Sequence, residues 1–490
     1  METILFSVLI VVLVVLLFAA ALMIFRAMMY GRVPDPVEAV ESISVDGPVV
    51  AEHLASAVRL PTVSSADRSQ IDYTAFDDLR LALERMYPRV HAALSCEVVG
   101  EYSLLYTWPG RSSSLPPVLL CGHMDVVPAD PSTLSEWTHP PFSGAIDGGY
   151  VWGRGALDMK STVIAVMEAV EGLIKTGFQP ERTVYLALGH DEEIGGLEGA
   201  RAIASLLIDR GERLEAVLDE GGAMLLGTLP GIALPVALVG VAEKGYASLE
   251  LKVEGRPGHS SMPPPHTAIG VLSRALTRLE ASPMPPRLAM ARLMFDQVGA
   301  FLPFGLRFAL ANSWLFGGAL RRRLEASPAT NALIRTTAAA TIIEGGVKDN
   351  ILPAQARAVV NCRLLPGDTR AAVLEHYRRA VNDEAVQISI PSGASWEPSL
   401  VSPVDSPVFG QLSRVIRQVF PEALVAPYLV SGATDSRHYQ PLTENIFRFS
   451  PYTLDSELLR TIHGIDERIA IDALERMVQF YAQIIKTWTS

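Results

Sequence analysis

The sequence reads VLLCGHMD at residues 118–125, GRGALDMK at residues 153–160 and VYLALGHDEE at residues 184–193. In the first and third segments a short apolar run, typical of a buried β-strand, ends at a histidine or at a group of carboxylates. A fourth segment, LEAVLDEGG at residues 214–222, has the same form. In open α/β sheets ligands bind outside the carboxyl ends of the strands, so we expect these polar side chains to converge there.

The residue types in these segments indicate what such a site would bind. Imidazole and carboxylate groups together suit zinc or a related divalent ion. Each segment alone has an ordinary explanation, because one His-x-Asp or Asp-Glu-Glu is more often a hydrogen-bonded or solvated turn. Asp158 fits that explanation least, since a carboxylate between glycine-rich backbone and an apolar helix is costly unless it is paired or coordinated. We therefore interpret these segments, together with HGIDER at residues 463–468, as one metal site.

Helical and extended patterns alternate around these segments. Apolar residues recur at helical spacing over residues 49–60, 73–94, 159–175 and 197–208. Strand-like runs separate the later helices. This β-α-β-α-β order predicts an α/β fold whose catalytic domain has a doubly wound, mainly parallel sheet.

The length of 490 residues exceeds one ordinary core and predicts more than one domain. Near residue 241 the pattern changes to a hairpin with alternating strands, which predicts an inserted α+β domain over residues 241–366; the family resemblance described below implies that it is a lid or dimerisation domain. The catalytic domain then consists of residues 49–240 and 367–490. Within the insertion, residues 288–324 are rich in aromatic and apolar residues and predict a helical hairpin. This hairpin either packs on its own domain or forms a lipid-facing or acyl-chain-binding surface.

The N-terminus carries a long uncharged segment at residues 4–25. At about 1.5 Å per residue, a helix of this length spans a hydrocarbon core of roughly 30 Å. Glu2 precedes the run, whereas a signal peptide usually begins with positive charge, so we favour an uncleaved, single-pass anchor. The anchor comprises residues 1–30 and a linker comprises residues 31–48. Arg26 and Arg32 follow the span, but two charges are a small topological bias, so the side of the membrane is left open.

Charge and missing motifs argue against several classes of function. The formal net charge of −12 argues against nucleic acid as a partner. Met159 stands before Lys160, where a phosphate-binding loop needs glycine. No Gly-x-Ser-x-Gly segment supports a serine hydrolase.

Together the segments resemble the dinuclear-zinc family of carboxypeptidases, aminoacylases, acetylornithine deacetylase and succinyl-diaminopimelate desuccinylase. The resemblance covers about residues 50–490. It is strongest to the branch of the Gly-Xaa carboxypeptidase and the N-fatty-acyl-amino-acid hydrolase, through PATNALIRTT at 328–337, GVKDN at 346–350 and SGATDSRHY at 431–439. The resemblance implies two divalent metal ions, expected to be zinc.

The resemblance also implies the metal ligands. Asp158 would bridge the two ions. His123 and Asp219 would complete the coordination of one ion, and Glu193 and His463 that of the other.

Further roles in catalysis and substrate binding follow from the same resemblance. Glu192 would be the general base that takes a proton from the attacking water. Asp125 would orient the His123 imidazole. In the inserted domain His259 would stabilise the oxyanion, and in dimeric members of the family this histidine comes from the partner subunit. Asn350 and Arg363 would hold the transition-state oxygen and the substrate carboxylate.

These observations predict a metal-dependent hydrolase that cleaves the amide bond of N-acyl amino acids, with long fatty acyl groups favoured, or of short peptides with a free carboxylate. One alternative is a Gly-Xaa carboxypeptidase of small dipeptides. An alternative of another class is a catalytically silent membrane binding protein of the same fold. The expected partners are a small-molecule substrate, the membrane and a second copy in a homodimer.

Overall fold

The computed structural model describes the chain except residues 32, 39, 41–42, 228–230, 392 and 394. Arg32 and three other positions of the predicted linker therefore lie outside the described residues. The chain divides into two compact units. The major unit comprises Val33–Val241, Val401–Tyr428 and Thr434–Ser490. The inserted unit comprises Met1–Arg32, Ala242–Leu400 and Leu429–Ala433.

The major unit is built on a sheet with strand order β1-β2-β6-β3-β7-β17-β9-β8-β18, and β16 also pairs with β9. Its strands are β1 (Ser95–Val99), β2 (Ser103–Trp108), β3 (Val118–His123), β6 (Val184–Gly189), β7 (Ala216–Asp219), β8 (Met224–Leu225), β9 (Val236–Glu243), β16 (Leu424–Val430), β17 (Ile446–Arg448) and β18 (Thr453–Leu454). The central strands β6, β3, β7 and β17 are parallel. Strands β1, β2 and β9 pair antiparallel beside them.

The α/β fold is therefore confirmed, and the sheet is mixed, with parallel strands at its centre and antiparallel strands beside them. A physical reason is visible at β1 and β2. Only a short turn joins these strands, and a turn of that length permits an antiparallel pair, whereas a parallel pair needs a crossover.

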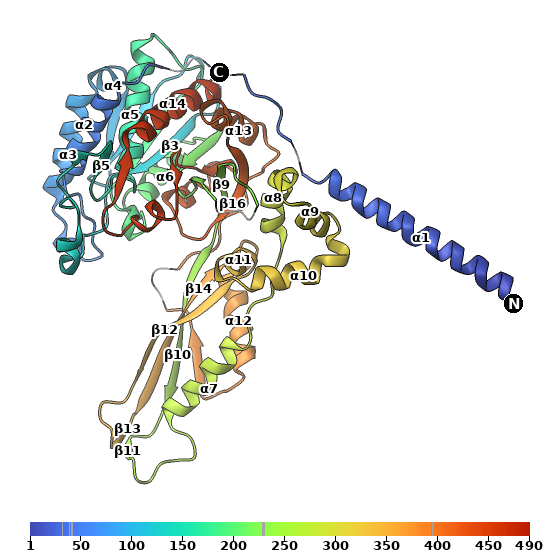
Figure 1. Cartoon of the computed structure of the whole chain (residues 1–490). Coiled ribbons are helices and arrows are strands. Elements are labelled where there is room, and N and C mark those ends of the chain that lie inside the picture. The colour runs from blue at the N-terminus through green and yellow to red at the C-terminus, as the bar shows by residue number, and fades with distance from the viewer. Residues whose placement is uncertain (32, 39, 41–42, 228–230, 392, 394) are drawn as a thin grey trace. The chain divides into compact units, whose positions relative to one another are not determined.

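Helices cover both faces of this sheet (Figure 1). They are α2 (Gly47–Val58), α3 (Tyr73–Met86), α4 (Pro88–Ala93), α5 (Lys160–Lys175), α6 (Ala200–Asp209), α13 (Pro407–Val419) and α14 (Ile471–Trp488). Helix α14 packs on α5, α2 and α13, while α6 buries Ile203 and Leu207 against Leu119 and Tyr185 of the sheet. The predicted helix at residues 73–94 is broken before Pro88, whose ring nitrogen cannot donate a helical hydrogen bond.

A small antiparallel sheet at the edge of the major unit has the order β19-β5-β4. Its strands are β4 (Ala145–Asp147), β5 (Tyr150–Trp152) and β19 (Arg468–Ala470). Short 3-10 helices connect the other elements: η1 (Arg68–Gln70), η2 (Pro131–Glu136), η3 (Glu192–Ile194), η5 (Asp435–Tyr439) and η6 (Leu458–Arg460).

The inserted unit has an antiparallel sheet with the order β12-β14-β10-β15. Its elements are β10 (Gly245–Glu254), β11 (Gly258–His259), α7 (Ala268–Glu280), β12 (Thr337–Gly345), β13 (Ile351–Leu352), β14 (Gln355–Leu364), α12 (Arg370–Val381) and β15 (Val386–Ser389). The predicted end of the insertion at residue 366 is too early. Strand β15 pairs with β10, and α12 contributes Val373 and Tyr377 to the core of the same sheet.

The inserted unit also holds the N-terminal helix and a group of short helices. These are α1 (Glu2–Met28), α8 (Ala289–Val298), η4 (Gly299–Phe301), α9 (Phe304–Ala311), α10 (Ser313–Glu325) and α11 (Pro328–Ile334). The predicted hairpin at residues 288–324 is thus a chain of short helices, and α9 contacts α1. Among the described residues α1 alone is long and apolar enough to cross a membrane, and such a helix fits a membrane span or a signal sequence.

Candidate metal centre

Three parallel strands bring polar side chains to one edge of the major sheet. His123 is the last residue of β3 and pairs with Gly189, the last residue of β6. The chain after β6 turns into η3, which carries Glu192 and Glu193. Strand β7 is parallel to β3 and is followed by Glu220. The strand ends therefore supply histidine and carboxylate groups to one place, as the sequence predicted.

The small sheet adds two more side chains. Strand β5 runs antiparallel to β19, with Trp152 opposite Arg468. The chain leaving β5 and the chain entering β19 consequently lie together, and the Gly153 amide donates a hydrogen bond to the Glu467 carbonyl at 2.8 Å. Asp158 follows β5 and His463 precedes β19, so this pairing brings them close although 305 residues separate them in the sequence.

The Asp158 carboxylate lies between two groups of donor atoms. Its Oδ1 is 3.2 Å from Nε2 of His123, and that nitrogen is also 3.2 Å from Oε1 of Glu220. Its Oδ2 is 3.0 Å from Nε2 of His463, which lies 3.3 Å from Oε1 of Glu193. Each group thus has one histidine, one carboxylate of its own and one oxygen of Asp158.

Glu220 occupies the position that the sequence assigned to Asp219. Among the described residues Asp219 belongs to none of the groups of closely spaced donor atoms, whereas Glu220 does. The buried Asp219 instead accepts a hydrogen bond at Oδ2 from the backbone amide of Ser436 in η5, at 2.7 Å. Consecutive side chains at a strand end point in opposite directions. The two neighbouring carboxylates therefore face different surroundings.

Asp125 connects His123 to the acidic turn. His123 turns Nδ1 toward the Asp125 backbone carbonyl at 2.9 Å, which leaves Nε2 facing the carboxylates. The fully buried Asp125 carboxylate accepts the backbone amides of Glu192 and Glu193, each at 3.1 Å, and the Ser64 hydroxyl at 2.7 Å. This arrangement is suited to the orienting role that the resemblance implies.

Glu467, to which the sequence analysis assigned no role, organises the Asp158 loop. Its buried carboxylate accepts hydrogen bonds from the backbone amides of Gly155, Leu157 and Asp158 at 2.8–3.0 Å. It also pairs with the Arg154 guanidinium at 2.6 Å. Gly155 has φ of +87°, a conformation that favours glycine. Glu467 lies in the segment HGIDER, just before a strand. This position is a weak signal, which alone would not reveal that Glu467 organises the Asp158 loop.

Burial and the excess of negative charge shift the pKa values in the centre. Burial, and next the charge of Asp158, raise the pKa of Glu220 to about 8. The neighbouring carboxylates of Asp158 and, next, Glu193 raise the pKa of His463 to about 10. Burial is also the main cause that raises the pKa of Glu192 well above its usual range. These shifts reflect the crowding of carboxylates in the centre, and a divalent cation would compensate the same charge.

The donor set fits divalent cations. Oε1 of Glu193 is buried and, among the described residues, has no hydrogen-bond partner, although it faces His463. A buried carboxylate oxygen without a partner is costly unless a cation or proton binds it. Two groups sharing Asp158 would hold two ions, with His123 and Glu220 on one and Glu193 and His463 on the other.

The three remaining predicted residues belong to the inserted unit. His259 is exposed in β11, where its Nδ1 lies 2.8 Å from the Ser261 hydroxyl. Asn350 is close to it, because its carbonyl accepts the Ser260 amide and β13 pairs with β11. Arg363 lies near the other end of β14, with its guanidinium 4.7 Å from the centre of the Tyr246 ring.

A carboxylate shared by two histidine–carboxylate groups, at the edge of an α/β sheet, is the site expected of a metal-dependent hydrolase. The pattern described as "Peptidase family M20/M25/M40" matches residues 119–487, and the chain belongs to this family. The resemblance inferred from the sequence is thereby confirmed.

Relatives and solved structures agree with this assignment. The chain is 43% identical over 442 residues to "Probable carboxypeptidase S-like 2" of Dictyostelium discoideum, covering 89% of this chain and 84% of that protein. It is also 43% identical over 442 residues to "N-fatty-acyl-amino acid synthase/hydrolase PM20D1" of Xenopus tropicalis, covering 89% and 85%. The crystal structure of an M20 family metallo-carboxypeptidase from Sulfolobus solfataricus shares the fold, with a TM-score of 0.63, 18% identity, and coverage of 90% of this chain and 99% of that one.

Proposed function

We propose that the protein hydrolyses the amide bond of N-acyl amino acids, including those with long fatty acyl groups, or of short peptides that end in a free carboxylate. The observation that carries this proposal is Asp158, whose two oxygens face two separate histidine–carboxylate groups. The similarity to a protein named as a probable carboxypeptidase and to one named as an N-fatty-acyl-amino acid synthase/hydrolase supports the substrate class.

The residues of the major unit would divide the work as follows. Two divalent ions, when bound, polarise the substrate carbonyl and lower the pKa of water. Glu192 takes the proton of the attacking water and returns it to the leaving amine, a task that suits its raised pKa. Asp125 holds the His123 ring and the backbone of the acidic turn in position.

We assign the ligands on the same geometry, with one change from the sequence analysis. Glu220 replaces Asp219 beside His123, because its carboxylate and not that of Asp219 approaches Nε2. Zinc is the proposed metal, since nitrogen and carboxylate donors suit it and each group leaves room for a water or substrate atom.

The substrate class is tested by comparing two amides on one metal-loaded preparation. We expect kcat/KM for N-oleoyl-phenylalanine to exceed that for the dipeptide Gly-Leu. Measuring free amino acid release gives both values. A clear preference for Gly-Leu contradicts the fatty-acyl proposal and favours the small-dipeptide carboxypeptidase. Absence of hydrolysis with either substrate favours the catalytically silent alternative.

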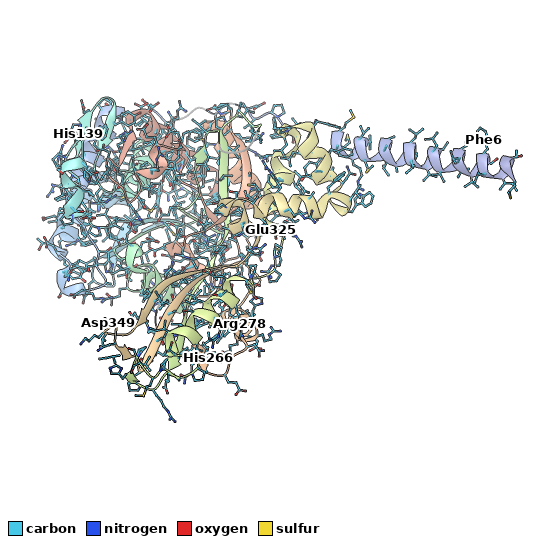
Figure 2. All side chains as sticks on the ribbon, turned by 60° about the horizontal axis from the view of Figure 1, so that its bottom comes forward. Phe6, His139, His266, Arg278, Glu325 and Asp349 are labelled. Carbon is cyan, nitrogen blue, oxygen red and sulfur yellow. The ribbon has the colours of Figure 1, made fainter. Side chains whose placement is uncertain are left out.

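We further propose that His259 acts from a second copy of the chain in a homodimer. The pairing of β10 with β14 places Tyr246 opposite Arg363 and Glu254 opposite Gln355, so the two strands run side by side for ten residues. At about 3.3 Å per residue, the ends of this ladder are roughly 30 Å apart. His259 and Asn350 lie beyond one end, and Arg363 lies near the other (Figure 2 labels the neighbouring Asp349). One small substrate cannot contact His259 and Arg363 of the same inserted unit.

An exposed edge strand would provide the dimer contact. In the part of the chain that the structure describes, strand β12 has a paired neighbour on one side only, and it exposes Ile342 and Ile343. Such an edge is a template for pairing with another chain.

Mixing two inactive variants tests this arrangement. His259→Ala and Glu192→Gln homodimers are each expected to be nearly inactive. Random exchange of subunits makes half of the dimers mixed, and each mixed dimer has one complete site, so activity should recover to about one quarter of wild type. Size-exclusion chromatography with light scattering checks the dimer. A stable mixed dimer without recovered activity would show that His259 acts within its own chain.

We propose that α1 is an uncleaved membrane anchor. Its apolar side chains are exposed over most of the helix, as Phe6 illustrates in Figure 2. Its last turns, in contrast, are fastened to the inserted unit. The Asn312 side-chain amide donates to the Met23 carbonyl at 3.1 Å, and the Tyr30 hydroxyl donates to Asp296 at 2.6 Å. A segment removed after export would not need these contacts.

A further inference from the structure

The end of α1 and the helices α8–α10 line an open cavity of about 600 Å³. Arg26 and Met29 of the N-terminal segment line one side. Arg292, Leu310 and Ser313 line the other side. The Arg292 guanidinium donates to the Ser313 hydroxyl, and the Asp296 carboxylate already accepts the Tyr30 hydroxyl. Two guanidinium groups from separate elements thus border one cavity, together with the Asp296 carboxylate, which accepts the Tyr30 hydroxyl within the same lining.

The backbone at the end of α1 packs closely against this region. A Cβ atom on Gly31 would come within 2.1 Å of the Ala300 amide nitrogen, and one on Gly299 within 2.8 Å of the Tyr30 ring. These glycines allow the two backbones to approach closely. The segment directly after α1 therefore forms part of the cavity wall.

The depth of the cavity relative to the bilayer follows from the geometry of helix α1. Asn312 contacts α1 at Met23, five residues before the helix ends at Met28. This offset corresponds to about 7.5 Å along a helix. An interfacial helix enters the boundary between headgroups and acyl chains by about 5–10 Å. If α1 spans the bilayer, the junction of α9 and α10 lies within that boundary.

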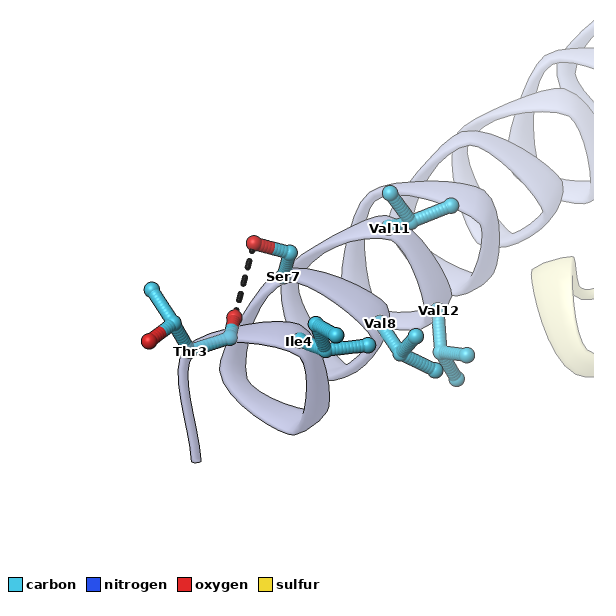
Figure 3. Close-up of a pocket in the computed structure, with 6 residues that line it drawn as sticks. All are labelled: Thr3, Ile4, Ser7, Val8, Val11 and Val12. Atoms are coloured by element: carbon cyan, nitrogen blue, oxygen red, sulfur yellow. Dashed lines mark hydrogen bonds between the residues drawn. The ribbon is translucent and has the colours of Figure 1, made fainter. Parts of the chain in front are cut away.

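From Ile4 to Phe25, Ser7 is the one residue of α1 with a polar side chain. The Ser7 hydroxyl donates to the Thr3 carbonyl at 3.0 Å and so is satisfied within the helix. Figure 3 shows this bond, with Ile4, Val8, Val11 and Val12 projecting from the neighbouring turns. A hydroxyl bonded to its own backbone is compatible with hydrocarbon.

Exposed apolar and basic residues next to the cavity match a membrane surface. Trp314 is 69% exposed, Leu315 53% and Phe304 48%. Tryptophan is enriched at the level of the headgroups because its ring is amphipathic. Three consecutive arginines, residues 321–323, are exposed toward the end of α10. Basic residues beside an amphipathic surface attract anionic lipid.

We propose that the end of α1 and the helices α9–α10 bind an anionic phospholipid of the bilayer, a proposal that rests on the anchor role given above for α1. The lipid phosphate lies between Arg26 and Arg292. Trp314 and Leu315 enter the acyl-chain region beside it. The inserted unit is thereby held at the membrane surface by two elements, α1 and the α9–α10 hairpin.

Trp314 provides a direct test in the full chain, reconstituted in phosphatidylcholine vesicles whose acyl chains carry bromine. Bromine quenches only tryptophans that reach the hydrocarbon. We expect quenching of a fraction of the wild-type fluorescence, and its loss in Trp314→Phe. Trp152→Phe, in the half-buried β5 strand, is the matched control and should retain the quenching. Equal quenching in Trp314→Phe and wild type, or none in wild type, overturns the proposal.

The headgroup site is tested with spin-labelled lipids in vesicles of equal parts phosphatidylcholine and phosphatidylglycerol. Wild type should immobilise phosphatidylglycerol several-fold more than phosphatidylcholine. The double variant Arg26→Gln/Arg292→Gln should lose most of this preference, whereas Arg379→Gln, an exposed arginine of α12, should keep it. An unchanged preference in the double variant overturns the phosphate site.

Two measurements on the same vesicles separate this proposal from those it depends on. Intact mass reports whether residues 1–28 remain, and their loss overturns the anchor together with the lipid site. Retained α1 with unquenched Trp314 overturns the lipid site alone. Hydrolysis of a soluble N-acyl amino acid tests the enzymatic proposal, and its absence leaves both lipid results standing.

Discussion

Replacing Glu192 with Gln is expected to lower kcat by about 10²–10⁴-fold, the usual contribution of a positioned general base. The amide retains the size of the side chain but cannot accept the proton of the attacking water. Burial raises the pKa of Glu192 well above its usual range, which makes the carboxylate a stronger base than an exposed one. Steady-state kinetics with N-oleoyl-phenylalanine, together with the metal content of the purified variant, provide the measurement.

The control is Glu198→Gln, the same chemical change a few residues further along. Glu198 is paired with Arg68 and, among the described residues, belongs to none of the groups of closely spaced donor atoms. Its variant should keep activity within a few-fold of wild type. Both variants should bind the same amount of metal. Wild-type turnover in Glu192→Gln would remove Glu192 from the role of general base.

Replacing Glu220 with Gln is expected to remove one of the two ions and to lower kcat/KM by on the order of 10³-fold. This loss should exceed the roughly 10–100-fold effect typical of residues that only support a ligand. Oε1 of Glu220 approaches Nε2 of His123 at 3.2 Å, so both side chains contribute to the same ion. Elemental analysis after dialysis, with kinetics on the same sample, measures both effects.

Asp219→Asn is the matched comparison, because it changes the neighbouring carboxylate in the same way. The asparagine oxygen can still accept the Ser436 amide, so the contact that Asp219 makes in the structure is retained. We expect this variant to keep two ions per chain. If Asp219→Asn loses an ion and Glu220→Gln keeps both, the ligand is Asp219.

The sequence by itself determined the parts that depend on local pattern. An apolar run long enough for a buried strand, followed at once by polar residues, located His123 and the Glu192–Glu193 pair at strand ends. Parallel strands then place those ends at one edge of the sheet. The apolar helix at the N-terminus could also be predicted from the sequence, since the prediction depends only on its length and composition.

Only the tertiary structure decided the parts that depend on side-chain direction and long-range pairing. Asp219 and Glu220 are adjacent in sequence, but their side chains leave the strand in different directions. Asp219 therefore faces Ser436, whereas Glu220 faces His123. The insertion extends past residue 366 because β15 pairs with β10, more than 130 residues earlier. Glu467 supports the Asp158 loop only because β19 lies beside β5. No local pattern encodes these contacts, since each joins segments that are distant along the chain.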